Sequence, residues 1–327
     1  MRHSRVTIAA VVVLFAGGLS ACAAEPPADA DPTATVAPTP TTEPVELTSP
    51  ERLLDGDCEA LFTSADVAGL VGTALQPSSS EWSLDPDYLV IGQLGGIDCT
   101  WTELPVPGGV ALSLIALPTS QVTRSPTTEC TPGYGCIFGS VEGDFSLYGV
   151  LYDPTAPIAT TTAATQAITA AFAAATSTVT APEPYVVDAE WPTEIDCATL
   201  DAGGLIGAAA GGAGGAGMEW GGDAEPNTGY YAAQTPAGVT KCGWAGAGDE
   251  NAVVTVLPGG AWAVDEVSTA AGAAPVEVEG ADSAVAVGDR LHVFAGDNWF
   301  TITVTSAGTD AFVPAAAELV AELDALS

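Results

Sequence analysis

One phrase occurs twice in this chain, and it constrains the fold more than any other feature. "DCEALFTSADVAGLVG" begins at Asp57, and "DCATLDAGGLIG", four residues shorter, begins at Asp196. Each copy is followed by a Cys-x-Trp triplet, "CTW" at Cys99 and "CGW" at Cys242. The cysteines of the two copies are separated by similar intervals, 41 and 45 residues. We therefore expect a duplicated unit, and the length of the chain suits two domains of ordinary size.

The cysteines indicate a framework of disulfide bonds. Six remain when Cys22 is set aside, and sequence alone allows fifteen pairings for six cysteines. They are Cys58, Cys99, Cys130, Cys136, Cys197 and Cys242. The symmetry of the repeat favours Cys58–Cys99 and Cys197–Cys242, with Cys130 and Cys136 closing a small local loop. Zinc binding or a redox thiol is the competing interpretation, and the absence of C-x-x-C spacing weakens it.

Local patterns predict the elements around these cysteines. In the first copy, Thr63 to Asp66 fits a capping-box start of a helix, and Gly72 fits its end. The second copy lacks four residues, which is about one helical turn. Its helix can therefore be one turn shorter and still point the same face to the core. Cys and Trp two residues apart on a strand share one face. We therefore expect Trp101 and Trp244 to be structural aromatics that pack beside the disulfides.

The remainder of each copy predicts an α+β fold. The strands are expected in "GGVALSLIALP" and "VEGDFSLYGVLY" in the first copy, and in "NAVVTVLP", "ADSAVAV", "RLHVFA" and "NWFTITVT" in the second. A helix is expected to close each copy. Alternation of Phe300 and Ile302 with threonines predicts a half-buried antiparallel last strand. The expected architecture is two tandem repeats, residues 51–180 and 188–327, each an antiparallel sheet packed with helices and stapled by disulfides.

The first residues predict export and a lipid anchor. A basic start and the apolar run Val6 to Leu19 have the layout of a signal peptide, residues 1–21, and the run is too short for a membrane span of ~20 residues. Leu19-Ser20-Ala21-Cys22 resembles the bacterial lipobox, which makes Cys22 the lipidation site. An ordinary cleaved signal or a buried helix is the alternative. Residues 22–50 form a lipid-attached Pro/Thr-rich linker, so we expect the protein on the outer face of the cell membrane.

These features together resemble a family of actinobacterial cell-envelope lipoproteins that is classed as a domain of unknown function. The resemblance rests on Cys58-Glu59-Ala60-Leu61, Gly72 and Cys99-Thr100-Trp101 in the first copy. Cys197-Ala198-Thr199-Leu200, Gly207, Cys242-Gly243-Trp244 and "GADSA" at Gly280 carry it in the second. Cys130 and Cys136 are not part of that pattern. The resemblance implies a location and a fold, and the family has no catalytic residues to transfer.

The charge of the chain excludes one class of partner. The 41 acidic residues all lie after Cys22, where only Arg52, Arg124, Lys241 and Arg290 balance them. A chain without a basic patch has no footprint for a phosphate backbone, so no nucleic-acid partner is expected. The acidic clusters "DGDCE" and "LDPDY" lack the spaced ligands of an EF-hand loop. We therefore expect no metal site and no cofactor, and whether the acidic surface binds cations stays open.

The residues favour a binding protein over an enzyme. His292 is the one histidine after Cys22, and it lies inside an expected strand, where a packed or solvated role is more common than a catalytic one. We expect a non-catalytic module that binds a cell-wall component, a small extracellular ligand or an envelope protein. Five aromatic residues expected in loops, Trp82, Tyr88, Trp220, Tyr230 and Tyr231, are candidate contacts. A carboxylate-dependent hydrolase, glycosidase-like, and a carrier of lipid or small ligands are the alternatives.

Overall fold

The computed structural model describes most of the chain that follows the expected linker. The described residues are 48–78, 84–103, 108–185, 191–192, 195–200, 204–212, 218–219, 229–245, 251–304 and 308–327. The expected signal peptide, Cys22 and most of the linker lie outside these ranges. Among the described residues, no helix combines the length and the apolar character that a membrane span requires. Residues Glu46 to Ser327 form one compact unit.

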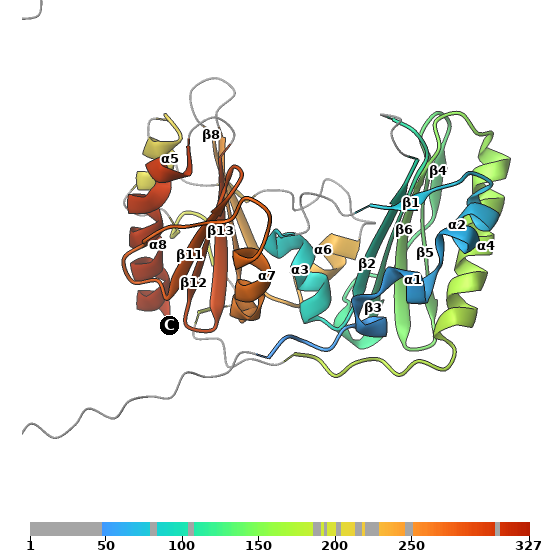
Figure 1. Ribbon diagram of the computed structural model, residues 1–327, viewed down its shortest axis with the longest axis horizontal. Helices are drawn as coiled ribbons and strands as arrows, with labels where there is room; N and C mark the ends of the chain where they lie inside the picture. Colours follow the sequence, from blue (N-terminus) through green and yellow to red (C-terminus); the bar gives the residue numbers. More distant parts are fainter. Residues whose placement is uncertain are drawn as a thin grey trace, which may run out of the picture. The chain divides into compact units, whose positions relative to one another are not determined.

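The first repeat is an antiparallel sheet of six strands with helices on its two faces (Figure 1). The strand order is β1-β2-β3-β6-β5-β4. The helices are η1 (Leu53–Gly56), α1 (Cys58–Leu61), α2 (Ser64–Val71), α3 (Pro86–Gln93), η2 (Thr119–Gln121) and α4 (Ile158–Thr176). The strands are β1 (Gln76–Pro77), β2 (Ile97–Thr102), β3 (Ala111–Pro118), β4 (Glu129–Thr131), β5 (Gly135–Glu142) and β6 (Phe145–Tyr152).

The second repeat reproduces this topology in a sheet of seven strands. Its order, β10-β11-β12-β13-β9-β8-β7, matches that of the first sheet when it is read backwards and β10 is left out. The helices are α5 (Leu205–Ala209), α6 (Gly229–Gln234), η3 (Gly260–Ala263), α7 (Val264–Ser268), η4 (Thr309–Phe312) and α8 (Val313–Leu326). The strands are β7 (Met218–Glu219), β8 (Thr240–Ala245), β9 (Asn251–Leu257), β10 (Ala274–Pro275), β11 (Ser283–Val287), β12 (Arg290–Ala295) and β13 (Asn298–Val304). The prediction of an α+β fold with two antiparallel sheets is confirmed.

The disulfides connect the repeated phrases to their sheets. Cys58 pairs with Cys99, Cys197 with Cys242, and Cys130 with Cys136. These are the three pairs that the symmetry of the repeat favours. In the loop-entropy description, each of the two long bridges stabilises the fold by about 4 kcal/mol, because it restricts the unfolded chain.

The local chemistry of the first phrase explains its helix. The Thr63 side chain accepts from the Asp66 backbone N–H, and the Asp66 carboxylate accepts from the Thr63 backbone N–H, which completes a capping box. Gly72 ends α2 with φ of 83°, a left-handed conformation that favours glycine. In the second repeat the corresponding helix is α5, of only five residues. The helix is shorter, but Gly207, the counterpart of Gly72 in the repeated phrase, lies inside α5 and does not end it.

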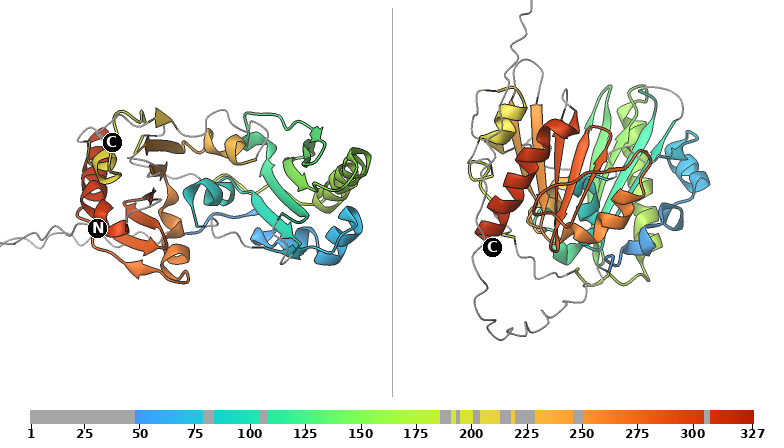
Figure 2. Two further views of the ribbon diagram at one scale, coloured as in Figure 1. Left: turned by 90° about the horizontal axis from the view of Figure 1, so that it is seen from above. Right: turned by 60° about the vertical axis from the view of Figure 1, so that its left-hand side comes forward.

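Each sheet has an outer core of its own. On the first sheet, Trp101, Leu112 and Leu147 pack with Ile168 and Phe172 of α4. On the second sheet, Trp244, Val254 and Phe300 pack with Leu319 and Leu323 of α8. Figure 2 shows α4 and α8 on the outer sides of the two sheets. Cys99 and Cys242 belong to the same outer cores as the tryptophans two residues later.

The inner faces of the two sheets share a third core in which helices are exchanged. Leu89 and Val90 of α3, which belongs to the first repeat, pack with Leu257 of β9 and Trp299 of β13 in the second. In return, Ala232 and Ala233 of α6 join Ile115 and Tyr148 of the first sheet. Figure 1 shows α3 and α6 between the two sheets. Each repeat thus covers the inner face of the other.

This exchange corrects the prediction for the last strand. Thr301 is as fully buried as Phe300 and Ile302, so β13 is buried on both faces over these residues and is not half-buried. The reason is that α3 and η3 lie against this strand, on the face that the sequence pattern assigned to solvent. An alternating pattern normally marks a strand with one solvated face.

We predict that the two repeats unfold together. Phe172 lies in the outer core of the first sheet, and replacing a buried Phe with Ala costs about 3–5 kcal/mol. Phe172→Ala should therefore shift a single calorimetric transition to lower temperature, and the fluorescence of the tryptophans of the second repeat should follow the same shift. Thr160→Ala, at an exposed position of the same helix, is the control. Two separate transitions, of which only one moves, would contradict the prediction.

Candidate functional site

The scarce cations of the chain meet at the boundary between the two repeats. Arg290 Nε lies 3.5 Å from Asp85 Oδ2, and Lys241 Nζ bonds to Asp87 Oδ2. Both acids belong to the N-terminal end of α3, whereas the two cations begin or lie within strands of the second sheet. A third pair joins Arg52 to Glu266 of α7, with 3.4 Å between Nη2 and Oε2. Every ion pair found among the described residues therefore links one repeat to the other.

Neutral side chains extend this boundary network. Gln234 of α6 donates to Asp87 Oδ1 at 3.1 Å, so both oxygens of that carboxylate are held by the second repeat. Gln93 of α3 accepts from the indole N–H of Trp262 at 3.1 Å and donates to the carbonyl of Pro258 at 3.0 Å. These groups are buried, and buried polar atoms are costly unless they are paired. The network thus specifies how α3 lies on the second sheet.

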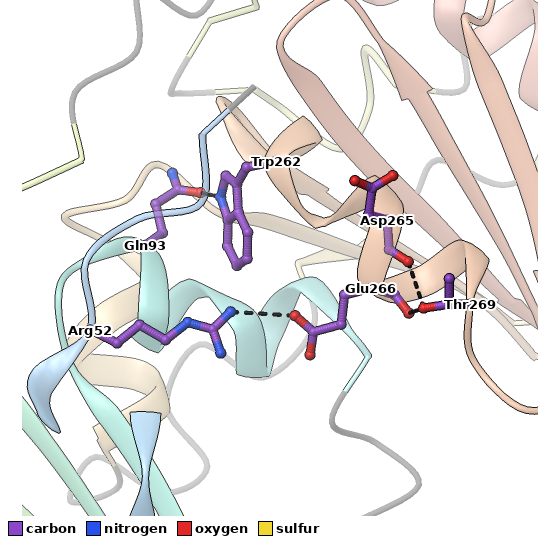
Figure 3. Close-up of polar contacts among 6 residues, drawn as sticks. All are labelled: Arg52, Gln93, Trp262, Asp265, Glu266 and Thr269. Carbon is purple, nitrogen blue, oxygen red and sulfur yellow. Dashed lines mark hydrogen bonds and ion pairs between the residues drawn. The ribbon is translucent and has the colours of Figure 1, made fainter. Parts of the chain in front are cut away.

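Arg52 is positioned by packing as well as by charge (Figure 3). Its guanidinium carbon lies 5.2 Å from the centre of the Trp262 ring, while its Nη2 reaches Glu266. The side chain crosses α3 at Gly92, where a Cβ atom would come within 2.7 Å of Arg52 Nε. A larger residue at position 92 would therefore displace the Arg52 side chain from this place. Arg52 thus connects the start of the described chain to the second repeat.

A pocket of about 140 Å³ lies beside this arginine. Its apolar wall comes from α3 and the start of β2, and Gly56, Gly92 and Gly96 contribute backbone surface. Its polar wall consists of four side chains. The lining residues are Arg52, Gly56, Tyr88, Leu89, Ile91, Gly92, Gly96, Ile97, Asp98 and Glu266. The pocket therefore draws on both repeats.

Asp98 differs from the other acids of the boundary. Its Oδ2 accepts from the Tyr230 hydroxyl at 2.7 Å, and the Tyr230 ring meets the Tyr88 ring edge-on at 4.5 Å. Its Oδ1 is shielded from solvent and has no hydrogen-bond partner among the described residues. Burial raises the pKa of Asp98 to about 6, against which the Tyr230 hydrogen bond acts only in part. Asp85, Asp87 and Glu266 each have a cation as partner, whereas Asp98 has a neutral hydroxyl.

Burial also controls the other titratable groups of the boundary. The pKa of Asp85 is raised by its burial and by the charge of Asp87, and Lys241 and Arg290 act in the opposite direction. The pKa of Tyr88 is raised to about 12 by burial and the neighbouring carboxylates. His292 is buried in β12, stacked on Trp299, and burial lowers its pKa to about 3. His292 is therefore neutral and packed at neutral pH.

The residues singled out in the sequence do not gather at the pocket, except for Tyr88. The six cysteines are all bonded, and Trp101 and Trp244 are buried in the outer cores, away from the pocket. Cys22 lies outside the described residues, as do Trp82 and Trp220. The prediction of loop aromatics was wrong for Tyr88, Tyr230 and Tyr231, which belong to α3 and α6. Tyr88 and Tyr230 pack on each other because the exchanged helices meet there.

The sequence interpretation missed the site itself. "LDPDY" was read as an acidic cluster, although Pro86 at the first turn and Gly95 just past the last turn are signals of a short helix. The partners of its two aspartates lie at least 147 residues further along the chain. Asp98 immediately precedes the motif residue Cys99, and alternation alone assigns it to the face opposite the disulfide. Comparisons of the chain with models of protein families, with curated proteins and with solved structures find no match.

We predict that Asp98→Asn stabilises the protein at neutral pH. Because the pKa of Asp98 is raised from 3.8 to about 6, the folded state binds more protons than the unfolded state between these values. The free energy of unfolding therefore falls as the pH rises through that window, and the full cost is present above pH 6. The variant, whose amide oxygen can still accept from Tyr230, should gain on the order of 2 kcal/mol at pH 7.5 and about nothing near pH 3.5.

Urea denaturation at several pH values measures this difference. Asp85 contributes a slope of the same sign to both proteins, so the comparison isolates Asp98. Asp289→Asn, at an exposed turn, should leave the curve unchanged. A variant that is less stable than the parent at pH 7.5 would refute the prediction.

We predict that Lys241 and Asp87 are strongly coupled. Lys241→Met leaves a nearly buried carboxylate without its cation and should cost about 3 kcal/mol of unfolding free energy. In the double variant Lys241→Met/Asp87→Asn neither charge of the pair remains, so most of this loss should be recovered. A double-mutant cycle measures the coupling, and purely additive losses would contradict it.

Proposed function

We propose that the protein is an exported lipoprotein that is anchored to the outer face of the cell membrane and acts as a non-catalytic binding module. In this proposal the lipid on Cys22 holds the chain at the membrane, and the Pro/Thr-rich linker presents the two interlocked repeats in the envelope. The binding site is the pocket at the boundary between the repeats. Membership of the family of envelope lipoproteins that the motifs resemble is part of the same proposal.

Three disulfide bonds support the export part of the proposal. Disulfides form and persist outside the cytoplasm, and they are rare in the reducing cytosol. All six cysteines after Cys22 are bonded in the structure. This usage agrees with the signal-like start of the chain and with Cys22 as the one cysteine left for a lipid.

The pocket beside Asp98 is the single observation that carries the binding part. It is formed jointly by α3, the start of the first repeat and Glu266 of the second. Asp98 is a partly buried carboxylate with a raised pKa and one shielded oxygen without a partner among the described residues, which costs stability, and such groups concentrate at functional sites. A purely structural boundary would gain stability from replacing Asp98, so its presence is best explained by a ligand.

A carboxylate-dependent hydrolase is the second candidate, and one observation favours it. Asp98, with its raised pKa, and Glu266 line the same pocket, as a general acid and a second carboxylate would. Against it, Glu266 is engaged by Arg52, and about 140 Å³ is small beside the 300–1,000 Å³ that is usual for small-molecule sites. The carrier alternative requires a large apolar cavity, whereas Ile115, Tyr148 and Trp299 fill the inter-sheet space. Binding without catalysis therefore explains the geometry best.

We predict that Cys22→Ala separates the protein from the membrane. The parent should incorporate radiolabelled palmitate and sediment with membranes, because two acyl chains are enough for stable anchoring. The variant should incorporate no label and appear in the soluble fraction. Ser20→Ala, within the same motif, is a control that keeps the acceptor thiol. Equal labelling of the parent and Cys22→Ala would refute the anchor.

A further inference from the structure

Asp98 is the one acid of the boundary network whose structural partner is not a cation. Asp85 has Arg290, Asp87 has Lys241, and Glu266 has Arg52. Asp98 receives one hydrogen bond from Tyr230, and its other oxygen is unpaired among the described residues. A buried charge is stable only when it is paired, so the arrangement lacks one positive charge at this point.

The pocket provides the place for that charge. Asp98 and Tyr88 line it together, and Arg52 at its edge is held by Glu266 and by the Trp262 ring. Because Arg52 is engaged in this way, the carboxylate of Asp98 is the charge in the pocket that no described side chain balances. A volume of about 140 Å³ holds several water molecules or a small organic cation.

The remaining walls select the type of cation. Leu89, Ile91 and Ile97 belong to the lining although they are largely buried, and their aliphatic carbon suits a short alkyl chain and offers no ligands to a metal ion. Ca²⁺ needs six to eight oxygen ligands. Asp98 has one oxygen without a partner among the described residues and Tyr88 has a hydroxyl, and both can accept N–H bonds, which a primary ammonium group supplies and a quaternary one does not. Because Asp98 Oδ1 is shielded from solvent in the structure, the carboxylate must turn toward the pocket to make this contact. The net charge of −35 attracts cations from solution and repels anions.

We propose that this pocket binds a small primary alkylammonium ion, whose charged group pairs with Asp98 and whose short carbon chain lies against Leu89, Ile91 and Ile97. The inference rests on the proposed function and names the class of ligand for its site. Tyr230 holds the carboxylate in place from the other side. Gly92 leaves room for Arg52 beside α3, and Arg52 is one of the residues that line the pocket.

Isothermal titration of the mature lipoprotein in neutral detergent micelles at pH 7.5 tests the proposal. The probes are n-butylamine, n-butanol, butyrate, tetramethylammonium and CaCl₂. We expect saturable one-to-one binding of n-butylamine, at least tenfold tighter than that of any other probe. Asp98→Asn should weaken the binding of n-butylamine by at least tenfold, and Tyr88→Phe should weaken it by a few-fold. Asp289→Asn, which removes an exposed acid far from the pocket along the chain, should leave it unchanged.

Thermal denaturation provides a second readout and verifies folding. n-Butylamine should raise the melting temperature of the parent and not that of Asp98→Asn, whose own melting temperature verifies that it is folded. Equal binding by the parent and Asp98→Asn, or tighter binding of Ca²⁺ than of the amine, would overturn the proposal. Binding of butanol or butyrate in place of the amine would refute the proposal that the ligand is a cation, but it would support the pocket as a binding site. Binding of none of the probes would refute the ammonium ligand, while palmitate labelling tests the anchor independently.

Discussion

Ion pairs across the boundary between the repeats are the interaction on which the rest of this structure depends. The chain has four basic residues after Cys22, and three of them pair with an acid of the opposite repeat. In so acidic a chain, surface repulsion disfavours the compact state, so cations have their largest effect where burial strengthens each pair. Breaking the pair of Asp85 or Asp87 leaves a buried carboxylate, which is why the boundary is specific rather than merely apolar, whereas the Arg52–Glu266 pair is more exposed.

The same boundary explains how two small sheets become one cooperative body. A sheet with one outer core would leave its inner face in water, but α3 and α6 are exchanged and cover these faces. Trp262 and Trp299 of the second repeat then pack with Leu89 and Val90 of the first. The disulfides restrict each repeat separately, whereas the exchanged helices and the ion pairs join them. The disulfides thus stabilise the individual repeats, and the non-covalent contacts stabilise their association.

The proposed binding site lies where this pairing is incomplete. At Asp98 the network offers a neutral hydroxyl where the other acids have cations, and a pocket lies beside it. A protein that tolerates an unpaired buried carboxylate loses stability there, and binding of a cation would restore it. The proposed ligand is therefore the counterpart of Lys241 and Arg290, supplied from solution. Residues of both repeats line this proposed site, so one repeat alone could not form it.

The sequence by itself determined the elements whose cause is local or symmetric. The capping box at Thr63, the Cys-x-Trp strands, the closing helices, the antiparallel sheets and the choice of disulfide partners all follow from spacing, period and the repeat. Only the tertiary structure decided which faces are covered and which charges meet. Thr301 is buried because α3 of the other repeat and η3 lie against β13, and Asp87 meets Lys241 154 residues later. Burial and electrostatic pairing depend on which segments lie close together in space. The hydrophobic pattern of a single strand or helix does not contain that information.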